Sequence, residues 1–238
     1  MTRSWYAKVL TLYPEMFPGT LGFSVIGKAR EKGIWDLETI NIRDFAQDKH
    51  QTVDDAAFGG GPGMVMRPDV VDRALCHACP QGPGKERIIY FSPRGEKITH
   101  SKIKQLAKEE KIVMICGRFE GIDQRVLDAW DVDELSLGDF VLCGGEVAAL
   151  ALIEACVRLL PNVVGKAASL EDESFATGLL EYPLYTRPAC WKGKNVPAVL
   201  LSGHHEKIQE WRNQQAEEIT KQRRPDMWEK YFDLNNRG

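Results

Sequence analysis

The sequence has no apolar run long enough to cross a membrane, because polar or charged residues interrupt every hydrophobic stretch before about 18 residues. The first residues, MTRSWYAKVLTLYPEMF, also lack the apolar stretch of a secretory signal, since Tyr6, Lys8 and Tyr13 interrupt them. The chain is 43% hydrophobic and 27% charged, as globular proteins are. We therefore expect a cytoplasmic protein that buries a core and does not enter a membrane.

Cysteine is sparse, with six residues in a chain of 238. Four have no near partner in the sequence: Cys116, Cys143, Cys156 and Cys190. This scatter favours reduced thiols over a disulfide framework. Cys76 and Cys79 form a single CxxC, but a zinc site normally needs a second pair of ligands. We therefore expect no metal site among these residues.

Neither sign of charge dominates, because 31 Lys and Arg stand against 34 Asp and Glu. One local stretch is basic, and its charges often stand beside tryptophan or histidine: Arg187, Lys192, Lys194, Lys207, Arg212, Lys221 and Arg223. Such a stretch suits contact with a phosphate backbone, but a solvated helix face has the same composition. Alone, it indicates nucleic acid only weakly.

Apolar runs rich in β-branched residues alternate with helical patterns through the first two thirds of the chain. This alternation predicts an α/β fold with a mostly parallel sheet. The predicted strands are 6–12, 37–42, 87–91, 112–116 and 134–136, with 141–143 as a short extension. The predicted helices are 21–32, 68–79, 99–110, 122–130 and 145–160. The last of these is apolar almost all round, so we expect it to be buried.

The pattern breaks after Pro161, where residues 162–177 are polar and small. This composition predicts a linker or a lid. Beyond it, prolines punctuate a loop-rich region, and helices are predicted over 204–223 and 227–232. The sequence thus predicts an α/β domain over 1–161, a linker over 162–177 and a small helical domain over 178–238.

Three loops with similar composition follow three of the predicted strands. YFSPRG follows 87–91, GRFEG follows 112–116 and SLGDFVLCGGE follows 134–136. Glycine costs backbone entropy unless unusual dihedrals or close approach need it. The carboxyl ends of parallel strands share one edge, where α/β proteins bind ligands. Each loop alone is an ordinary turn, but together they predict a small-molecule site.

A second glycine-rich segment, DDAAFGGGPGMVM at 54–66, has no GK[ST] ending and does not match a dinucleotide fingerprint. It is either a flexible surface loop or a backbone surface for a flat or anionic ligand. Arg158 interrupts the apolar face of the predicted helix 145–160. A buried arginine needs a partner, so it forms either a structural ion pair or a contact to negative charge on a substrate. The adjacent acids Glu171, Asp172 and Glu173 are candidates for proton transfer where they are partly buried.

The motifs, in this order, resemble the bacterial tRNA (guanine-N1-)-methyltransferase family of the SPOUT superfamily. The resemblance runs through LTLYPEMF, DDAAFGGGPGM, YFSPRG, CGRFEGIDQR, DELSLGDFVLCGGE, ESF, LLEYPLYTRP and SGHHEKIQEWR, almost the whole chain. It implies a deep trefoil knot in the α/β domain, a helical C-terminal domain that binds tRNA, and a homodimer with a composite active site. It further implies methyl transfer from S-adenosylmethionine to N1 of the guanosine at tRNA position 37.

The resemblance also assigns roles to residues of this chain. Those matching the pocket for S-adenosylmethionine are Tyr90, Phe91, Ser92, Pro93, Gly117, Phe119, Glu120, Gly121, Ser136, Leu137, Gly138, Asp139, Phe140, Val141, Leu142, Gly144 and Gly145. Glu173 matches the general base, where many relatives have aspartate, so Asp172 stays an alternative. Arg158 matches the arginine that stabilises charge at guanine O6. A Mg²⁺ requirement is left open.

The residues that match the tRNA-binding surface are Gly59, Gly60, Gly61, His204, His205, Trp211 and Arg212, which are expected to face the target base or the anticodon stem-loop. Two other hypotheses remain. A protein with this fold can bind RNA without turnover, and the glutamate at position 173 leaves that alternative open. An α/β phosphohydrolase can use a glycine loop on phosphates, but the absent GK[ST] speaks against it.

Overall fold

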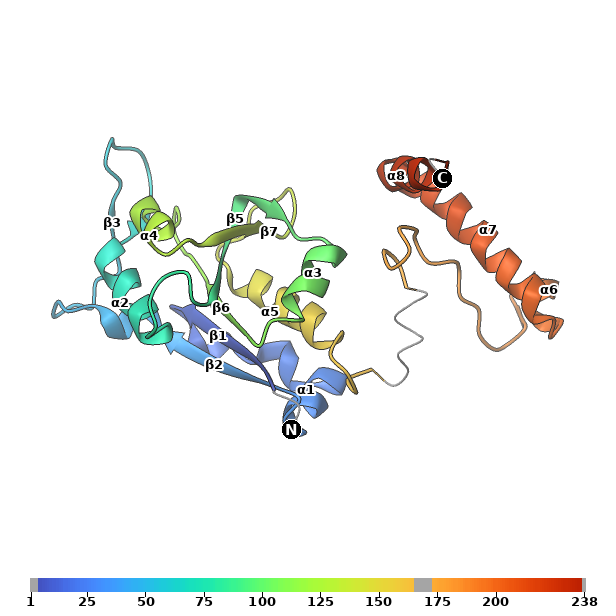
Figure 1. Cartoon of the computed structure of the whole chain (residues 1–238), viewed down its shortest axis with the longest axis horizontal. Helices are drawn as coiled ribbons and strands as arrows, with labels where there is room; N and C mark the ends of the chain where they lie inside the picture. The colour runs from blue at the N-terminus through green and yellow to red at the C-terminus, as the bar shows by residue number, and fades with distance from the viewer. Residues whose placement is uncertain (1–3, 165–172, 237–238) are drawn as a thin grey trace. The chain divides into compact units, whose positions relative to one another are not determined.

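The computed structural model describes residues 4–164 and 173–236. The chain forms two compact units, Met1–Gly165 and Lys166–Gly238, which are described separately (Figure 1). Among the described residues, no helix is both long and apolar enough to cross a bilayer.

The first unit is built on a five-stranded sheet with the order β2-β1-β6-β5-β7. Its strands are β1 (Trp5–Thr11), β2 (Trp35–Asn41), β5 (Arg87–Lys97), β6 (Lys111–Ile115) and β7 (Asp133–Ser136). All neighbouring strands of this sheet are parallel. The prediction of an α/β fold with a parallel sheet is confirmed.

Helices cover both faces of the sheet, because alternate side chains of the central strands point to opposite sides. On β1, Ala7 and Val9 pack on one face and Leu10 on the other. The first face is covered by α1 (Ser24–Glu31), α3 (His100–Leu106) and α5 (Glu146–Val157), and the second by α2 (Pro68–Ala78) and α4 (Gln124–Ala129) (Figure 1). The parallel strands therefore have buried faces on both sides, which explains their continuous apolar sequences.

Two predicted elements of this unit are wrong. Residues 141–143 form no strand, and Val141 is 82% exposed, because this apolar run lines a cavity instead of pairing with the sheet. The predicted helix 21–32 is divided into a 3-10 helix, Gly19–Gly22, and α1. The division occurs where the Gly22 carbonyl packs so closely on Gly27 that a Cβ there would lie 2.3 Å from the oxygen.

Helix α5 also differs from its prediction, since it is not buried all round. Ala149, Leu152 and Ile153 are buried, but Val147 is 50% exposed and Ala151 is exposed. An apolar outer face on a helix is a feature of surfaces that contact another molecule.

A short antiparallel ribbon, β3 (Asp54–Ala56) and β4 (Met64–Met66), flanks the second glycine segment. The sequence did not predict it, because three-residue strands carry too little alternation to be recognised.

The second unit consists of the hairpin β8 (Cys190–Trp191) and β9 (Lys194–Asn195) and the helices α6 (Ala198–Leu201), α7 (His205–Arg223) and α8 (Pro225–Asn236). The segment before the hairpin lies along α7: the Leu180 amide donates to Thr220 Oγ1 at 2.8 Å, and the Arg212 guanidinium lies 4.9 Å from the Tyr182 ring centroid. The predicted helix 204–223 is confirmed, but the hairpin was not predicted.

Candidate functional site

A cavity of about 250 Å³ lies beside the middle of β5 and at the carboxyl ends of β6 and β7. It is lined by the middle of β5, the end of β7, the loops that follow β6 and β7, and the start of α5: Tyr90, Phe91, Ser92, Pro93, Gly117, Arg118, Phe119, Glu120, Gly121, Leu135, Ser136, Leu137, Gly138, Phe140, Val141, Leu142, Cys143, Gly144, Gly145 and Ala148. The three motifs singled out by their composition therefore surround one cavity, but YFSPRG is not a loop as predicted: it lies within β5, which continues past Phe91 through an irregularity in its pairing with β7. The position of the cavity agrees with the general position of ligand sites in open α/β sheets.

One residue predicted for this pocket does not line it. The Asp139 side chain is 87% exposed and pairs with Lys97 at 2.9 Å. Four lining residues were not predicted: Arg118, Leu135, Cys143 and Ala148. Three of them lie beside predicted ones in the sequence, so proximity along the chain was the available signal.

Two glycines allow the loops of the pocket to approach one another. A Cβ on Gly117 would lie 2.6 Å from Tyr90 Cε2, and one on Gly145 would lie 2.9 Å from the Cys116 Cα. Their backbones are joined directly, because the Gly145 amide donates to the Gly117 carbonyl at 3.2 Å. The glycine-rich composition thus serves close backbone contact.

The walls of the cavity combine exposed apolar side chains with backbone polar groups. Phe119 is 51% exposed, Phe140 53% and Leu142 39%. Burial raises the pKa of Tyr90, so its hydroxyl stays neutral at physiological pH. Apolar walls around a few polar groups are typical of sites for small organic ligands.

An ion pair between a lining residue, Arg118, and a buried carboxylate supports this wall. Glu146, the first residue of α5, is 1% exposed, and its Oε2 lies 2.9 Å from Arg118 Nη2. Thr11 donates from Oγ1 to Glu146 Oε1 at 2.8 Å, and Arg118 Nη1 donates to the Cys143 carbonyl at 3.4 Å. The Arg118 guanidinium also lies 4.4 Å from the Tyr13 ring centroid. One side chain therefore joins the loops after β1 and β6 to the loop before α5.

The β3–β4 ribbon, which carries the second glycine segment at its tip, is hydrogen-bonded to the loop after β6 in the same wall. The Met66 amide donates to the Gly121 carbonyl at 2.9 Å, and the Glu120 amide donates to the Met64 carbonyl at 2.9 Å. At its tip, Gly59, Gly60 and Gly61 all have positive φ, and a Cβ on any of them would meet no atom within 4 Å. Their backbone is therefore open to a ligand.

The predicted catalytic residues belong to different units. Arg158 is the C-cap residue of α5. It is half-buried, whereas the sequence predicted a buried side chain. Glu173 is half-buried at the start of a turn, where its carbonyl accepts from the Ala176 amide at 3.0 Å. Asp172 lies outside the described residues.

The predicted tRNA-binding residues of the second unit divide into two kinds. His204 and His205 are exposed at the start of α7. Trp211 packs on Tyr185, with ring centroids 6.2 Å apart, and Arg212 covers the Tyr182 ring. The second pair therefore takes part in the packing of this unit.

The cysteines do not form a metal site in the part of the chain that the structure describes, where no group of three His, Cys, Asp or Glu side chains is placed to hold an ion. Burial, together with Glu86, raises the pKa of Cys79 to about 12, and the nearby Cys76 is exposed. All six thiols are free.

Comparison with known proteins relates this site to one family. A family model described as tRNA (Guanine-1)-methyltransferase TrmD matches residues 6–230. The tRNA (guanine-N(1)-)-methyltransferase of Rhodospirillum rubrum is 57% identical over 225 residues, which cover 94% of this chain and 93% of the relative. The proteins of the same name from Cereibacter sphaeroides and Zymomonas mobilis are 54% identical over 232 residues and 53% over 231, covering 96% and 97% of this chain and 93% and 92% of the relatives. The chain therefore belongs to the tRNA (guanine-N1-)-methyltransferase family.

Proposed function

We propose that this protein transfers the methyl group of S-adenosylmethionine to N1 of the guanosine at tRNA position 37. The observation that carries the proposal is the cavity formed by the middle of β5, the loops after β6 and β7, and the start of α5. Most of its residues come from three of the motifs that carry the resemblance to the family: YFSPRG, CGRFEGIDQR and DELSLGDFVLCGGE.

The cavity has features that suit S-adenosylmethionine. The rings of Phe119 and Phe140 are half exposed and can cover a flat adenine. Among the lining residues that the structure describes, Glu120 is the sole carboxylate, so it is the natural partner for positive charge on the ligand. When bound, S-adenosylmethionine supplies a methyl group activated by a sulfonium.

Acid–base chemistry is assigned to residues outside the cavity lining. N1 of guanine carries a proton that must leave before the nitrogen can form a bond to carbon. We assign its removal to the carboxylate of Glu173, with Asp172 as the alternative. As the proton leaves, negative charge moves to O6, where the guanidinium of Arg158 stabilises it.

The substrate is assigned to surfaces of both units. The open backbone of Gly59, Gly60 and Gly61 would contact the target base, while His204 and His205 would face the anticodon stem-loop. Recognition of an unpaired guanosine fits the way proteins bind RNA loops. We expect this reaction in the cytoplasm, where tRNA is modified.

We further propose a homodimer in which a second copy completes each active site. Support comes from apolar side chains exposed on the first unit: Phe23 is 74% exposed, and Val147 is 50% exposed. Exposed apolar surface of this kind marks contact with another molecule. The deep trefoil knot of the family belongs to the same proposal, although threaded chains are rare in general.

The test is methyl transfer by the purified protein. Labelled S-adenosylmethionine is mixed with a tRNA that has guanosine at positions 36 and 37, and the product is digested to identify 1-methylguanosine. We expect transfer with this tRNA and none when position 37 is adenosine. Activity no higher than that of Arg158→Ala would contradict the proposal and favour an RNA-binding protein without turnover. Repeating the assay in EDTA tests a role for Mg²⁺.

A further inference from the structure

The hairpin of β8 and β9 in the second unit ends in a tight turn. Trp191 pairs with Lys194 across the two strands, and Lys192 and Gly193 form the connection. Both connecting residues have positive φ, 50° and 76°, which is the geometry of a type I′ turn. The hairpin therefore has a defined shape even though it is short.

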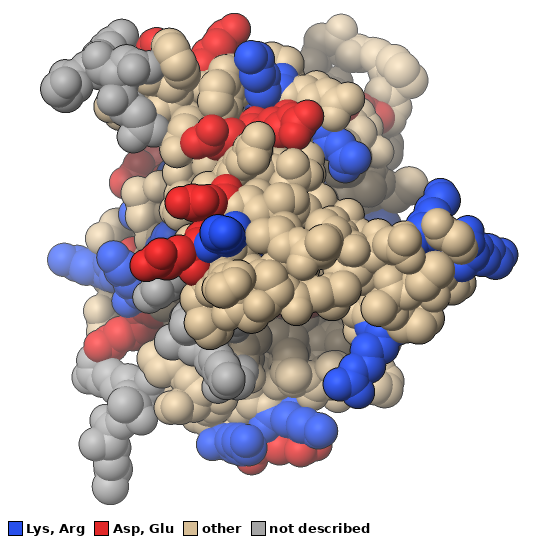
Figure 2. All heavy atoms as spheres, turned by 90° about the vertical axis from the view of Figure 1, so that its right-hand side faces the viewer, with Lys and Arg blue, Asp and Glu red and all other residues tan. Residues whose placement is uncertain are grey.

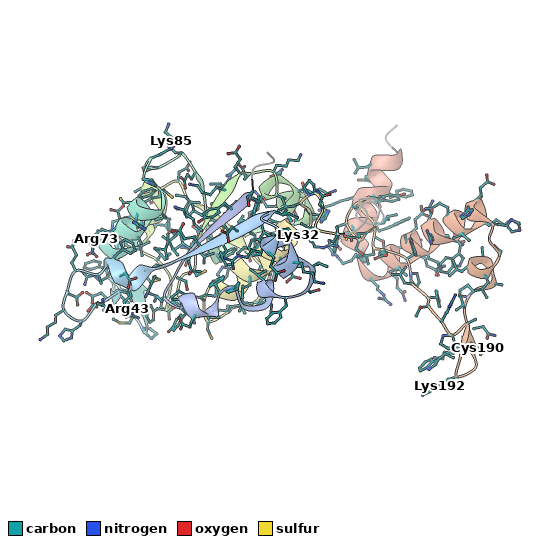
Figure 3. The ribbon with its side chains drawn as sticks, turned by 90° about the horizontal axis from the view of Figure 1, so that it is seen from below. Lys32, Arg43, Arg73, Lys85, Cys190 and Lys192 are labelled. Carbon is teal, nitrogen blue, oxygen red and sulfur yellow. The ribbon has the colours of Figure 1, made fainter. Side chains whose placement is uncertain are left out.

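No core lies beneath this hairpin among the residues that the structure describes. Every residue from 184 to 195 is exposed, and Trp191 itself is 59% exposed. Cys190 and Lys192 lie at the end of a hairpin that extends away from α7 (Figure 3). An isolated two-stranded hairpin is at best marginally stable in water, so a tryptophan presented on one is a feature of a contact surface.

The charge around this tryptophan has one sign. Between Glu181 and Glu206 there is no acidic residue, while Arg187, Lys192 and Lys194 are basic. On the face drawn in Figure 2, the Lys and Arg side chains at the right edge stand without Asp or Glu beside them. The surface thus complements a polyanion.

The tryptophan of the hairpin differs from the tryptophan of α7. Trp211 packs on Tyr185 within the unit, whereas Trp191 has Lys192 Nζ 5.0 Å from its ring centroid and is more than half exposed. A lysine at this distance is attracted to the ring face by a cation–π interaction. An aromatic ring between basic side chains is the arrangement by which proteins bind unpaired nucleotides.

We propose that the β8–β9 hairpin binds an unpaired nucleotide of the tRNA substrate, with the base stacked on Trp191 and the flanking phosphates held by Lys192 and Lys194. This inference rests on the proposed function, since it takes tRNA as the partner. It assigns the RNA-facing aromatic side chain of the second unit to Trp191 and gives Trp211 a packing role.

Loss of stacking lowers the affinity for tRNA, whereas loss of phosphate contacts lowers the dependence of that affinity on salt. Separate variants of Trp191 and of the two lysines therefore test the two halves of the proposal. Trp191→Ala is expected to weaken tRNA binding by about 5- to 150-fold, the range for loss of one stacked base, while Trp191→Phe retains most of the affinity. Lys192→Ala combined with Lys194→Ala is expected to reduce the slope of log K against log salt by about 1.4, or about 0.7 for each phosphate contact to a single strand. Dissociation constants are measured by filter binding at several salt concentrations.

The matched control for the lysines is Lys32→Ala combined with Lys85→Ala. Both side chains are exposed and lie in the first unit, before the amino ends of β2 and β5, and neither lines the cavity (both are labelled in Figure 3). We expect no change in salt slope for this control. Binding of S-adenosylmethionine and thermal unfolding should match the wild type in all variants, because the hairpin residues are exposed.

Three outcomes would overturn the inference: unchanged tRNA affinity in Trp191→Ala, equal losses in the lysine and control variants, or conversion of a dimer to a monomer by Trp191→Ala. The last would show that the hairpin packs on a second copy of the chain. Failure of the proposed function has a separate signature. In that case the wild-type protein transfers no methyl group, while Trp191→Ala still weakens RNA binding.

Discussion

Arg118 and Glu146 form an ion pair at 2.9 Å in which the carboxylate is almost completely buried, behind the wall of the cavity. Arg118 lies in the loop after β6 and Glu146 at the start of α5, and Thr11 donates a further contact to Glu146 from the end of β1. Burying a charge is costly unless it is paired and hydrogen-bonded, and here both conditions are met. The shape of the cavity wall therefore depends on the pairing of Arg118, which lines the cavity, with a buried carboxylate that does not.

Arg118→Ala should strongly destabilise the protein, because it leaves the Glu146 carboxylate buried without its partner. We expect the free energy of unfolding to fall by about 3–5 kcal/mol, measured by urea denaturation. The control is Arg125→Ala. Arg125 pairs with Asp123 at 2.7 Å but is 71% exposed, so the expected loss is below about 1 kcal/mol. Equal losses in the two variants would contradict this account.

Gly117→Ala should weaken binding of S-adenosylmethionine. The added Cβ would lie 2.6 Å from the Tyr90 ring, so the loop after β6 or the Tyr90 side chain on β5 must shift. Overpacking of this kind costs about 1–3 kcal/mol, and we expect a rise of about 5- to 150-fold in the dissociation constant measured by calorimetry. In Gly22→Ala the nearest contact would be an ordinary 3.5 Å, and donor affinity should not change.

Glu173→Gln should remove the proposed base while keeping the size of the side chain. We expect kcat to fall by about 10²–10⁴-fold with little change in donor binding, measured in single-turnover assays. Asp172→Asn is the paired variant and should lose far less. The reverse order would move the base to Asp172.

Cysteine labelling should report on the pocket without any mutation. Cys76, Cys143 and Cys190 are exposed, and Cys143 lines the cavity, so bound S-adenosylmethionine should protect Cys143 from iodoacetamide but not Cys190. Burial raises the pKa of Cys156 to about 12 and that of Cys116 well above its usual value.

Because the thiolate is the reactive form, Cys116 and Cys156 should stay unlabelled at pH 8 until the protein unfolds. Mass spectrometry of the labelled peptides makes the comparison. Equal labelling of Cys143 with and without the ligand would argue against binding in this cavity.

Sequence patterns predicted the sheet and the loops of the cavity, because the patterns involved are local. A run such as 112–116 is apolar on both faces of a strand, and the glycines stand directly after it. Arg118, which follows Gly117, was not predicted as a site residue, although its side chain joins the loops after β1 and β6 to the loop before α5. Its partner Glu146 is 28 residues away, and no periodicity links the two.

The β8–β9 hairpin was not predicted for a different reason. Its strands have two residues each, and its turn uses Lys192 and Gly193 rather than the common Asn-Gly pair. Similarly, 141–143 has the composition of a strand but no partner strand. Composition alone does not distinguish an apolar segment that pairs from one that lines a cavity.

The hydrogen bond from Thr11 to Glu146 joins residues 135 positions apart in the chain. Contacts of such sequence separation carry an entropic cost and slow folding, since the intervening segment must be closed into a loop. During synthesis, the contacts of Glu146 with Thr11 and Arg118 therefore form only after the start of α5 has left the ribosome. Until then, a nascent chain whose sheet strands have all been translated still lacks the contacts that support the wall of the cavity for the methyl donor.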